Sequence, residues 1–371
     1  MQFQIKKPAD LLDEKGRLTS PGWATDLLLR YDKDSIKAPK FKIKEWDYYC
    51  ILQDNEGIAL TVSDNGYFGF VGATIFDFDT PKETSNNVFL SFPMGSLNLP
   101  PSSKEGDIHF SKKDISFNFL HKGEKRYLEV VYPNFSEGND LFVSITLSQP
   151  NKPKPMDTMV IATPFSKSKH AFYYNQKVNC MPAEGQVKLG DKIIDFKPSS
   201  AFGVLDWGRG VWTYSNTWYW GSASGLADGI PFGFNIGYGF GDTSKATENM
   251  LFYNNKAHKL DKVQFHIPPD DFVKPWKFIS NDNRFEMDFY PIIDRNSNFN
   301  LGLLKSIQHQ VFGRFSGKAV LDDGQEIIIK DFLGFAEKVS KKLRMASAEV
   351  IYPSNIPSDT CQRAYFPLRL C

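Results

Sequence analysis

Apolar and polar residues alternate with a period of two along most of this chain. In residues 41–52, FKIKEWDYYCIL, both faces of the expected strand carry charged as well as aromatic residues. Turn residues follow at 54–57 and the alternation resumes at Ile58, which predicts a hairpin. Further strand-like segments lie at 115–120, 126–132, 140–147, 185–189, 192–196, 230–240, 263–267, 284–290, 311–321 and 326–335. No amphipathic helix is evident between them, so the pattern predicts an all-β protein.

Segment 230–240 has one unusually bare face. Its large apolar residues alternate with small or polar ones, namely Pro231, Gly233, Asn235, Gly237 and Gly239. A bare face is expected where a second layer or a ligand approaches the sheet closely. Packing of sheet on sheet and a ligand site are both open readings.

Three pairs of short segments recur in the same order, which predicts an internal duplication. The anchor pairs are Trp46 with Trp218, Tyr132–Pro133 with Tyr290–Pro291, and Asp206 with Glu337. The offset between the copies falls from one pair to the next, as expected if the second copy has shorter loops. The division that follows is an N-terminal strap at 1–40, units at 41–212 and 213–345, and a tail at 346–371.

The stretch 201–225, AFGVLDWGRGVWTYSNTWYWGSASG, is the candidate pocket. It holds four of the seven tryptophans of the chain around one acid and one base, Asp206 and Arg209. Indole rings are large and their N–H groups need partners, so a cluster of them predicts a shared aromatic wall. The four are Trp207, Trp212, Trp218 and Trp220.

Composition excludes several classes of function. Lys+Arg 44 against Asp+Glu 43 leaves a formal charge of +1, and no basic run interleaved with aromatics predicts a nucleic-acid surface. The chain has neither an apolar leader at its N-terminus nor a spanning apolar segment, so we expect a soluble, cytoplasmic protein with no integral membrane segment. The four cysteines are widely spaced and are expected to be reduced thiols.

Familiar site motifs are missing from the sequence. It has no His-Glu-x-x-His, no phosphate loop and no metal-ligand spacing among its six histidines, so no metal or cofactor is expected. GSASG at 221–225 has Ala223 where a nucleophile elbow needs serine. Carboxylates among aromatics remain as the candidate chemistry.

Asp206 and Arg209 are the candidate catalytic pair. They could form a structural ion pair across a turn, duplicated as Glu337 with Lys338 or Lys341. Alternatively, Asp206 is a general acid whose proton is retained in an apolar site. An adjacent Arg209 would lower the pKa of Asp206, so this role requires Arg209 to point elsewhere or Asp206 to act as a base.

Further candidates come from neighbouring segments. Glu45 and Asp47 share a strand face and would repel each other unless one is protonated or paired. In HAFYYN, His170 to Asn175, polar groups could line a pocket mouth. The complete set of expected ligand-binding residues is Trp207, Trp212, Tyr214, Trp218, Trp220, Asn235, Glu45, Asp47, Tyr48 and Tyr174.

The sequence also resembles a known family. Segments ADLLDEKGRLTSPGWA, IKEWDYY, AFYYN, LDWGRGVW, WYWGSASG and DFLGFAEK are similar to a widespread family that is classified only as a domain of unknown function. More distantly, the repeated all-β layout resembles the double-lipocalin group, which includes carotenoid hydratases, AttH proteins and fungal pericyclase-like enzymes. That resemblance implies two tandem lipocalin-like barrels or sandwiches and an apolar, isoprenoid-like ligand.

Three hypotheses about function follow. The first is a protein that binds an apolar small molecule between the Trp-rich stretch and segment 230–240. The second is an enzyme of hydratase, isomerase or cyclase type that uses a buried carboxylic acid. The third is a protein-interaction module with exposed aromatic residues. The sequence leaves the oligomeric state open.

Overall fold

The computed structural model describes residues 2–150, 154–165, 168–213, 215–269, 271–301 and 304–343. Tyr214 and the predicted tail from residue 346 lie outside these ranges. Within them, the only helices are two three-residue 3-10 turns, η1 (Lys33–Ser35) and η2 (Lys40–Lys42). The predicted all-β fold is therefore confirmed. No helix in the described ranges has the length and apolar character needed to cross a membrane.

The larger of two antiparallel sheets contains most of the first half of the chain. Its strands follow the order β7-β6-β5-β4-β15-β13-β11-β10-β9-β8, and β14, β12 and β2 join it beside this path. The bounds are β2 (Gly22–Ala24), β4 (Ile43–Gln53), β5 (Glu56–Asp64), β6 (Phe68–Asp77), β7 (Lys82–Ser91), β8 (Ile108–Lys112), β9 (Ile115–Lys122), β10 (Lys125–Ser136), β11 (Asn139–Ser148), β12 (Met159–Pro164), β13 (Phe172–Leu189), β14 (Lys192–Phe196) and β15 (Phe202–Val211).

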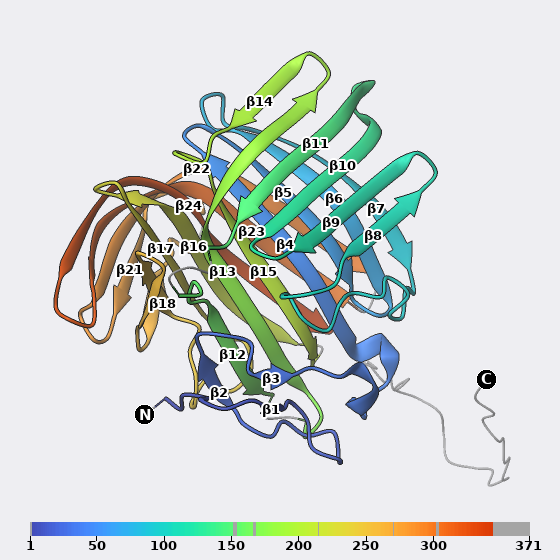
Figure 1. The fold of residues 1–371 in the computed structure, drawn as a ribbon, viewed down its shortest axis with the longest axis vertical. Helices are drawn as coiled ribbons and strands as arrows, with labels where there is room; N and C mark the ends of the chain where they lie inside the picture. Colours follow the sequence, from blue (N-terminus) through green and yellow to red (C-terminus); the bar gives the residue numbers. More distant parts are fainter. Residues whose placement is uncertain are drawn as a thin grey trace, which may run out of the picture.

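The second half of the chain forms the other curled sheet (Figure 1). Its order is β19-β18-β17-β16-β24-β23-β22-β21-β20. The bounds are β16 (Asn216–Ala227), β17 (Ile230–Tyr238), β18 (Met250–Tyr253), β19 (Lys256–Lys259), β20 (Val263–His266), β21 (Trp276–Ser280), β22 (Phe285–Leu301), β23 (Leu304–Val320) and β24 (Glu326–Leu343).

The two sheets repeat one topology. The order of the second sheet matches that of the first if β23 takes the place of β13 and β11. The register agrees as well: Asp206 pairs with Tyr48 and Gly208 with Trp46, while Glu337 pairs with Trp220 and Val339 with Trp218. Two independently chosen sequence anchors thus occupy equivalent places in equivalent strand pairs, which supports the predicted duplication.

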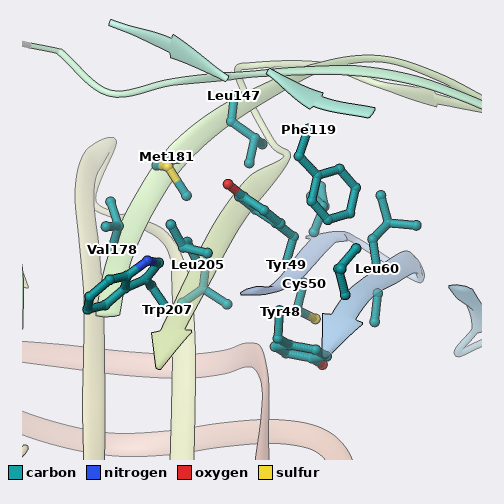
Figure 2. Close-up of a cluster of buried hydrophobic side chains, with 14 of the residues drawn as sticks. Tyr48, Tyr49, Cys50, Leu60, Phe119, Leu147, Val178, Met181, Leu205 and Trp207 are labelled. Carbon is teal, nitrogen blue, oxygen red and sulfur yellow. The ribbon is translucent and has the colours of Figure 1, made fainter. Parts of the chain in front are cut away.

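Strands β4 and β15 are neighbours near the middle of the first sheet, and both of their faces are covered. Every residue of β15 is buried. A strand buried on both sides has no solvent face, so its sequence does not sort into apolar and polar positions. Figure 2 shows the two directions on β4: Tyr49 points toward Phe119 inside the first unit, whereas Tyr48 points to the opposite side. Tyr48 contacts Trp220 and Phe335 of the second sheet.

A bulge in β13 joins the two sheets. The register shifts between Val178 and Met181, and Cys180 has a φ of +58°. At this bulge, Asn179 donates to Ser222 Oγ at 2.8 Å and to the carbonyl of Phe234 at 3.2 Å. A Cβ on Gly233 would lie 2.6 Å from the Cys180 sulfur. At Gly233, the bare face of segment 230–240 therefore packs against the first sheet. This agrees with the first of the two interpretations of its sequence, packing of sheet on sheet.

The N-terminal segment connects both units at one end of the molecule (Figure 1). Strands β1 (Ala9–Asp10) and β3 (Leu29–Arg30) pair in parallel, and β2 pairs with β12 of the first sheet. Gln2 reaches the second half of the chain, where its amide donates to the carbonyl of Leu260 and accepts from the amide of Thr247. This segment braces the contact between the sheets.

We expect Asn179→Ala to destabilise the protein by about 2 kcal/mol, because it leaves buried acceptors of the second sheet without a donor. Urea unfolding followed by fluorescence measures the change. Asn118→Ala is the matched control, since Asn118 contacts the exposed ring of His109. Equal stability of the two variants would contradict the role of Asn179 in holding the two sheets together.

Candidate functional site

A cavity of about 370 Å³ lies between the two sheets. The first sheet contributes side chains from β4, β5, β6, β7, β13 and β15, and the second contributes side chains from β16, β22, β23 and β24. Lining residues at its centre include Trp46, Tyr48, Tyr173, Lys177, Asp206, Trp218, Trp220 and Glu337. The site is therefore built by the faces that the two units turn toward each other.

Aromatic rings form one continuous wall of this cavity. Trp212 lies at its centre, with ring centroids 5.7 Å from Trp46, 5.2 Å from Trp218 and 5.5 Å from Tyr173, all edge to face. Such T-shaped contacts are a favoured geometry for aromatic pairs. Gly208 makes room for this wall, because a Cβ at that position would clash with the ring of Trp46.

Asp206 projects from β15 into the cavity and is held by two donors. Its Oδ1 accepts from Lys177 Nζ at 2.8 Å and from Asn175 Nδ2 at 2.6 Å. The same ammonium group lies 3.8 Å from the ring centroid of Trp220. Both hydrogen bonds use Asp206 as an acceptor, as suits an ionised carboxylate. The Lys177–Asp206 ion pair thus lies against the indole face of Trp220.

Glu337, from the equivalent position on β24, has a different environment. Trp218 Nε1 donates to one carboxyl oxygen at 3.0 Å and Gln308 Nε2 donates to the other at 3.3 Å. Burial raises the pKa of Glu337 to about 7, while Lys177 acts in the opposite direction. The side chain lines the cavity although the residue is almost fully buried. Glu337 is therefore a carboxylic acid that still holds its proton in part near neutral pH.

A third buried carboxyl, that of Glu248, lies behind the wall against Gly237. In the described part of the chain neither of its oxygens has a hydrogen-bond partner, and the same is true of the nearby Tyr173 hydroxyl. Burial raises the pKa of Glu248 to about 8, with Asp206 and Glu337 adding to the effect of burial and Lys177 opposing it. Asp206, Glu337 and Glu248 thus form an electrostatically coupled group around Lys177.

The structure separates Asp206 from Arg209. Positions three apart on a strand project to opposite faces, so the ion pair predicted across a turn does not form. Arg209 instead lies within the first unit, where it donates to Asp47 Oδ1 at 2.9 Å and to the carbonyls of Trp46 and Pro100. Glu45, 3.9 Å from Arg209, also pairs with Lys33 at 2.6 Å. Glu45 and Asp47 are therefore paired and buried, and lie away from the cavity.

The other predicted residues are divided in the same way. Tyr48, Trp212, Trp218 and Trp220 line the cavity. Trp207 and Tyr174 lie on the Arg209 side, where their rings meet edge to face at 5.5 Å. Asn235 lies behind the wall and accepts from Trp220 Nε1 at 2.7 Å, and Tyr214 is outside the described residues. From HAFYYN, Tyr173 reaches the cavity, whereas His170 is 3.4 Å from the carbonyl of Gly16.

The sequence did not place Trp46, Lys177, Glu248 or Lys341 in the candidate pocket. Trp46 lies on the same strand face as Tyr48, and the duplication pairs it with Trp218, so period and repeat together could have indicated it. Lys177 and Glu248 carry no such signal, because each reaches the site through contacts distant in sequence. In the described ranges, no group of three or more His, Cys, Asp or Glu residues could hold a metal ion.

The family model described as Domain of unknown function (DUF2804) matches residues 2–343, so this chain belongs to that family. The resemblance noted in the sequence is confirmed. The comparison with curated proteins gives no match.

Solved structures share the fold at low sequence identity. CghA, at 10% identity, has a TM-score of 0.52, with 91% of this chain and 97% of that chain covered. A putative AttH from Nitrosomonas europaea has a TM-score of 0.49 at 12% identity, covering 84% and 96%. Kievitone hydratase from Nectria haematococca has a TM-score of 0.47 at 11% identity, covering 90% and 98%. The predicted tandem lipocalin-like fold is confirmed, and likeness at this identity extends to the fold alone.

Replacing Glu248 with Gln should stabilise the protein at alkaline pH. The folded-state pKa lies above the unfolded value, so the folded state binds the extra proton and stability falls as pH rises from about 4.5 to about 8. We expect Glu248→Gln to remove this part of the decline and to gain about 5 kcal/mol at pH 9 relative to pH 4. Thermal unfolding across this range checks it, with exposed Glu129→Gln as control. Parallel pH profiles for wild type and Glu248→Gln would contradict the prediction.

Proposed function

We propose that this protein binds an apolar small molecule in the cavity between its two sheets. The observation that carries the proposal is the aromatic wall around Trp212, which encloses a space within the usual range of ligand pockets. Flat apolar surfaces that meet a few buried polar groups favour ligands with a planar or extended hydrocarbon body. One structural neighbour, CghA, was crystallised with the compound Sch210972, at a TM-score of 0.50 and 10% identity.

The test begins with the ligand. Organic extraction of the purified protein followed by mass spectrometry should release an apolar compound, and fatty acids, retinoids or terpenoids should quench the tryptophan emission of the apo protein. Failure of extraction and of the whole panel would contradict binding.

Trp218→Leu should weaken the binding of a quenching ligand at least tenfold, about 1.4 kcal/mol, because it removes one side of the wall. Trp218 is only partly buried, so the fold should tolerate the change. Trp23→Leu is the matched control, since Trp23 lies on β2 outside the cavity. Competition with a fluorescent ligand gives both affinities, and far-UV circular dichroism confirms that both variants are folded. Equal affinities would exclude this wall as the binding surface.

A second candidate function, proton-transfer catalysis on the bound molecule, is favoured by Glu337. A protonated carboxyl can donate its proton to a carbon–carbon double bond, and the positive charge that develops is stabilised by adjacent indole faces. Asp206, an acceptor held by Lys177, is then placed to remove a proton from an attacking water or from a neighbouring carbon. The first route gives hydration and the second gives isomerisation. Here Glu337 is the acid, whereas the sequence had suggested Asp206.

Glu337→Gln should abolish turnover while ligand affinity changes less than about threefold, because glutamine keeps the shape but has no acidic proton. In the wild type, the rate should fall as pH rises through about 7, where the carboxyl loses its proton. Incorporation of deuterium from D2O into the extracted ligand, followed by mass spectrometry, measures both effects. Glu326→Gln, an exposed position on the same strand, is the control. Unchanged incorporation in Glu337→Gln would leave binding as the function.

A further inference from the structure

Two lysines enter the cavity at one end, one from a central strand of each unit. Lys44 lies on β4 and Lys341 on β24, and both line the cavity. Lys44 Nζ donates to the backbone carbonyls of Phe41 and Asn65 and lies 4.1 Å from the ring centroid of Tyr67. An ammonium group carries three donors, and the described residues provide acceptors for two of them.

Lys341 is less satisfied than Lys44. Among the described residues its ammonium has no hydrogen bond or ion pair, and it lies 5.2 Å and 5.9 Å from the ring centroids of Trp218 and Trp212. A cation over indole faces is attracted by the ring quadrupole, but this contact does not replace hydrogen-bond acceptors. The end of the aromatic wall is therefore a place where donors lack an acceptor.

The other cations that line the cavity are already paired. Lys177 pairs with Asp206 at 2.8 Å, and Arg295 lies 3.5 Å from Glu83 and donates to Gln310. Among the described cations that line the cavity, Lys44 and Lys341 are thus the two without a carboxylate in contact. Unmatched positive charge is concentrated where Lys44 and Lys341 lie, beside the apolar surface of the wall.

We propose that Lys44 and Lys341 anchor the carboxylate of an apolar carboxylic acid, whose hydrocarbon body lies along the tryptophan wall. This inference rests on the proposed function, and it narrows the ligand class from apolar molecules in general to amphipathic anions. A carboxylate has two oxygens and accepts from two ammonium groups at once, which gives each lysine a charged acceptor.

The electrostatics of the apo protein agree with this geometry. Burial lowers the pKa of Lys44 to about 7, Lys341 lowers it further and Asp64 opposes this. Burial also lowers the pKa of Lys341 to about 8, against the effect of Glu337. A bound carboxylate favours the charged form of both lysines, so binding takes up protons. As pH rises above about 7, Glu337 also ionises and adds negative charge to the cavity. This weakens the binding of an anion at high pH, as does the loss of charge from the two lysines.

Two matched pairs of probes test the anchor: retinoic acid with retinol, and dodecanoic acid with dodecanol. Tryptophan quenching gives the retinoid affinities, and displacement gives those of the dodecyl pair. At pH 6.5 each acid should bind wild type at least tenfold more tightly than its alcohol. The affinity of the acids should fall about tenfold by pH 9, whereas that of the alcohols should stay constant.

Lys341→Gln should weaken the acids about tenfold and leave the alcohols unchanged, and Lys44→Gln should act in the same way. Lys338→Gln is the control, because this neighbour lies over the rings of Tyr219 and Phe272 and does not line the cavity. Thermal unfolding verifies that the variants are folded. If acid and alcohol bind equally, or if Lys341→Gln does not affect the acid, the anchor is wrong while cavity binding stands. If no probe binds the wild type, the proposed function fails and the anchor fails with it.

Discussion

The alternation of side chains along β15 is the constraint on which the rest of the structure depends. This strand lies between β4 and β13, so its backbone groups are used in pairing and its two faces must each be filled. On one face, the side chains of Trp207 and Arg209 point into the first unit. On the other face, Asp206 and Gly208 face the second unit. A shift of one residue would exchange these sets, placing the guanidinium in the cavity and a carboxylate among the buried aromatics. The fold and the site therefore depend on the same register.

Buried charged groups have more partners on one side of β15 than on the other. On the inner side, Arg209 has acceptors in Asp47 and in several backbone carbonyls, and Glu45 has both Lys33 and the Tyr31 hydroxyl. Burial still raises the pKa of Asp47, although Arg209 opposes this. A fully satisfied network of this kind fixes a structure. Toward the cavity, Glu337 and Glu248 are buried and Lys341 is partly buried, and all three have fewer partners among the described residues, which has a cost in stability. Such groups are common at functional sites.

The duplication explains why the cavity lies between the units. Trp46 with Asp206 and Trp218 with Glu337 occupy equivalent positions, and the sheets turn these equivalent faces toward each other. The resulting carboxyls are equivalent in position but have different neighbours. Lys177, from a strand that is part of the larger first unit, contacts Asp206 directly, whereas Glu337 is held by neutral donors. A repeated backbone thus supplies two acids in unlike environments.

The sequence by itself determined the strands, the repeat and most of the aromatic wall, because these depend on local periodicity and on residue types that sort themselves into a core. Tyr48, Trp212, Trp218 and Trp220 were found in this way. The period of two predicts that Asp206 and Arg209 lie on opposite faces of a strand. It does not predict which residue faces the cavity, because β15 is buried on both faces and its sequence has no polar side.

Only the tertiary structure decided which charges meet. Lys177 is 29 residues from Asp206 in the chain but is its register partner across the β13–β15 ladder. Glu248 comes from the connection between β17 and β18, and Lys44 and Lys341 come from opposite halves of the chain. Such groups carry no common sequence pattern, because a charge is perturbed by its neighbours in space and by loss of water, and both are fixed only when the two sheets close on each other.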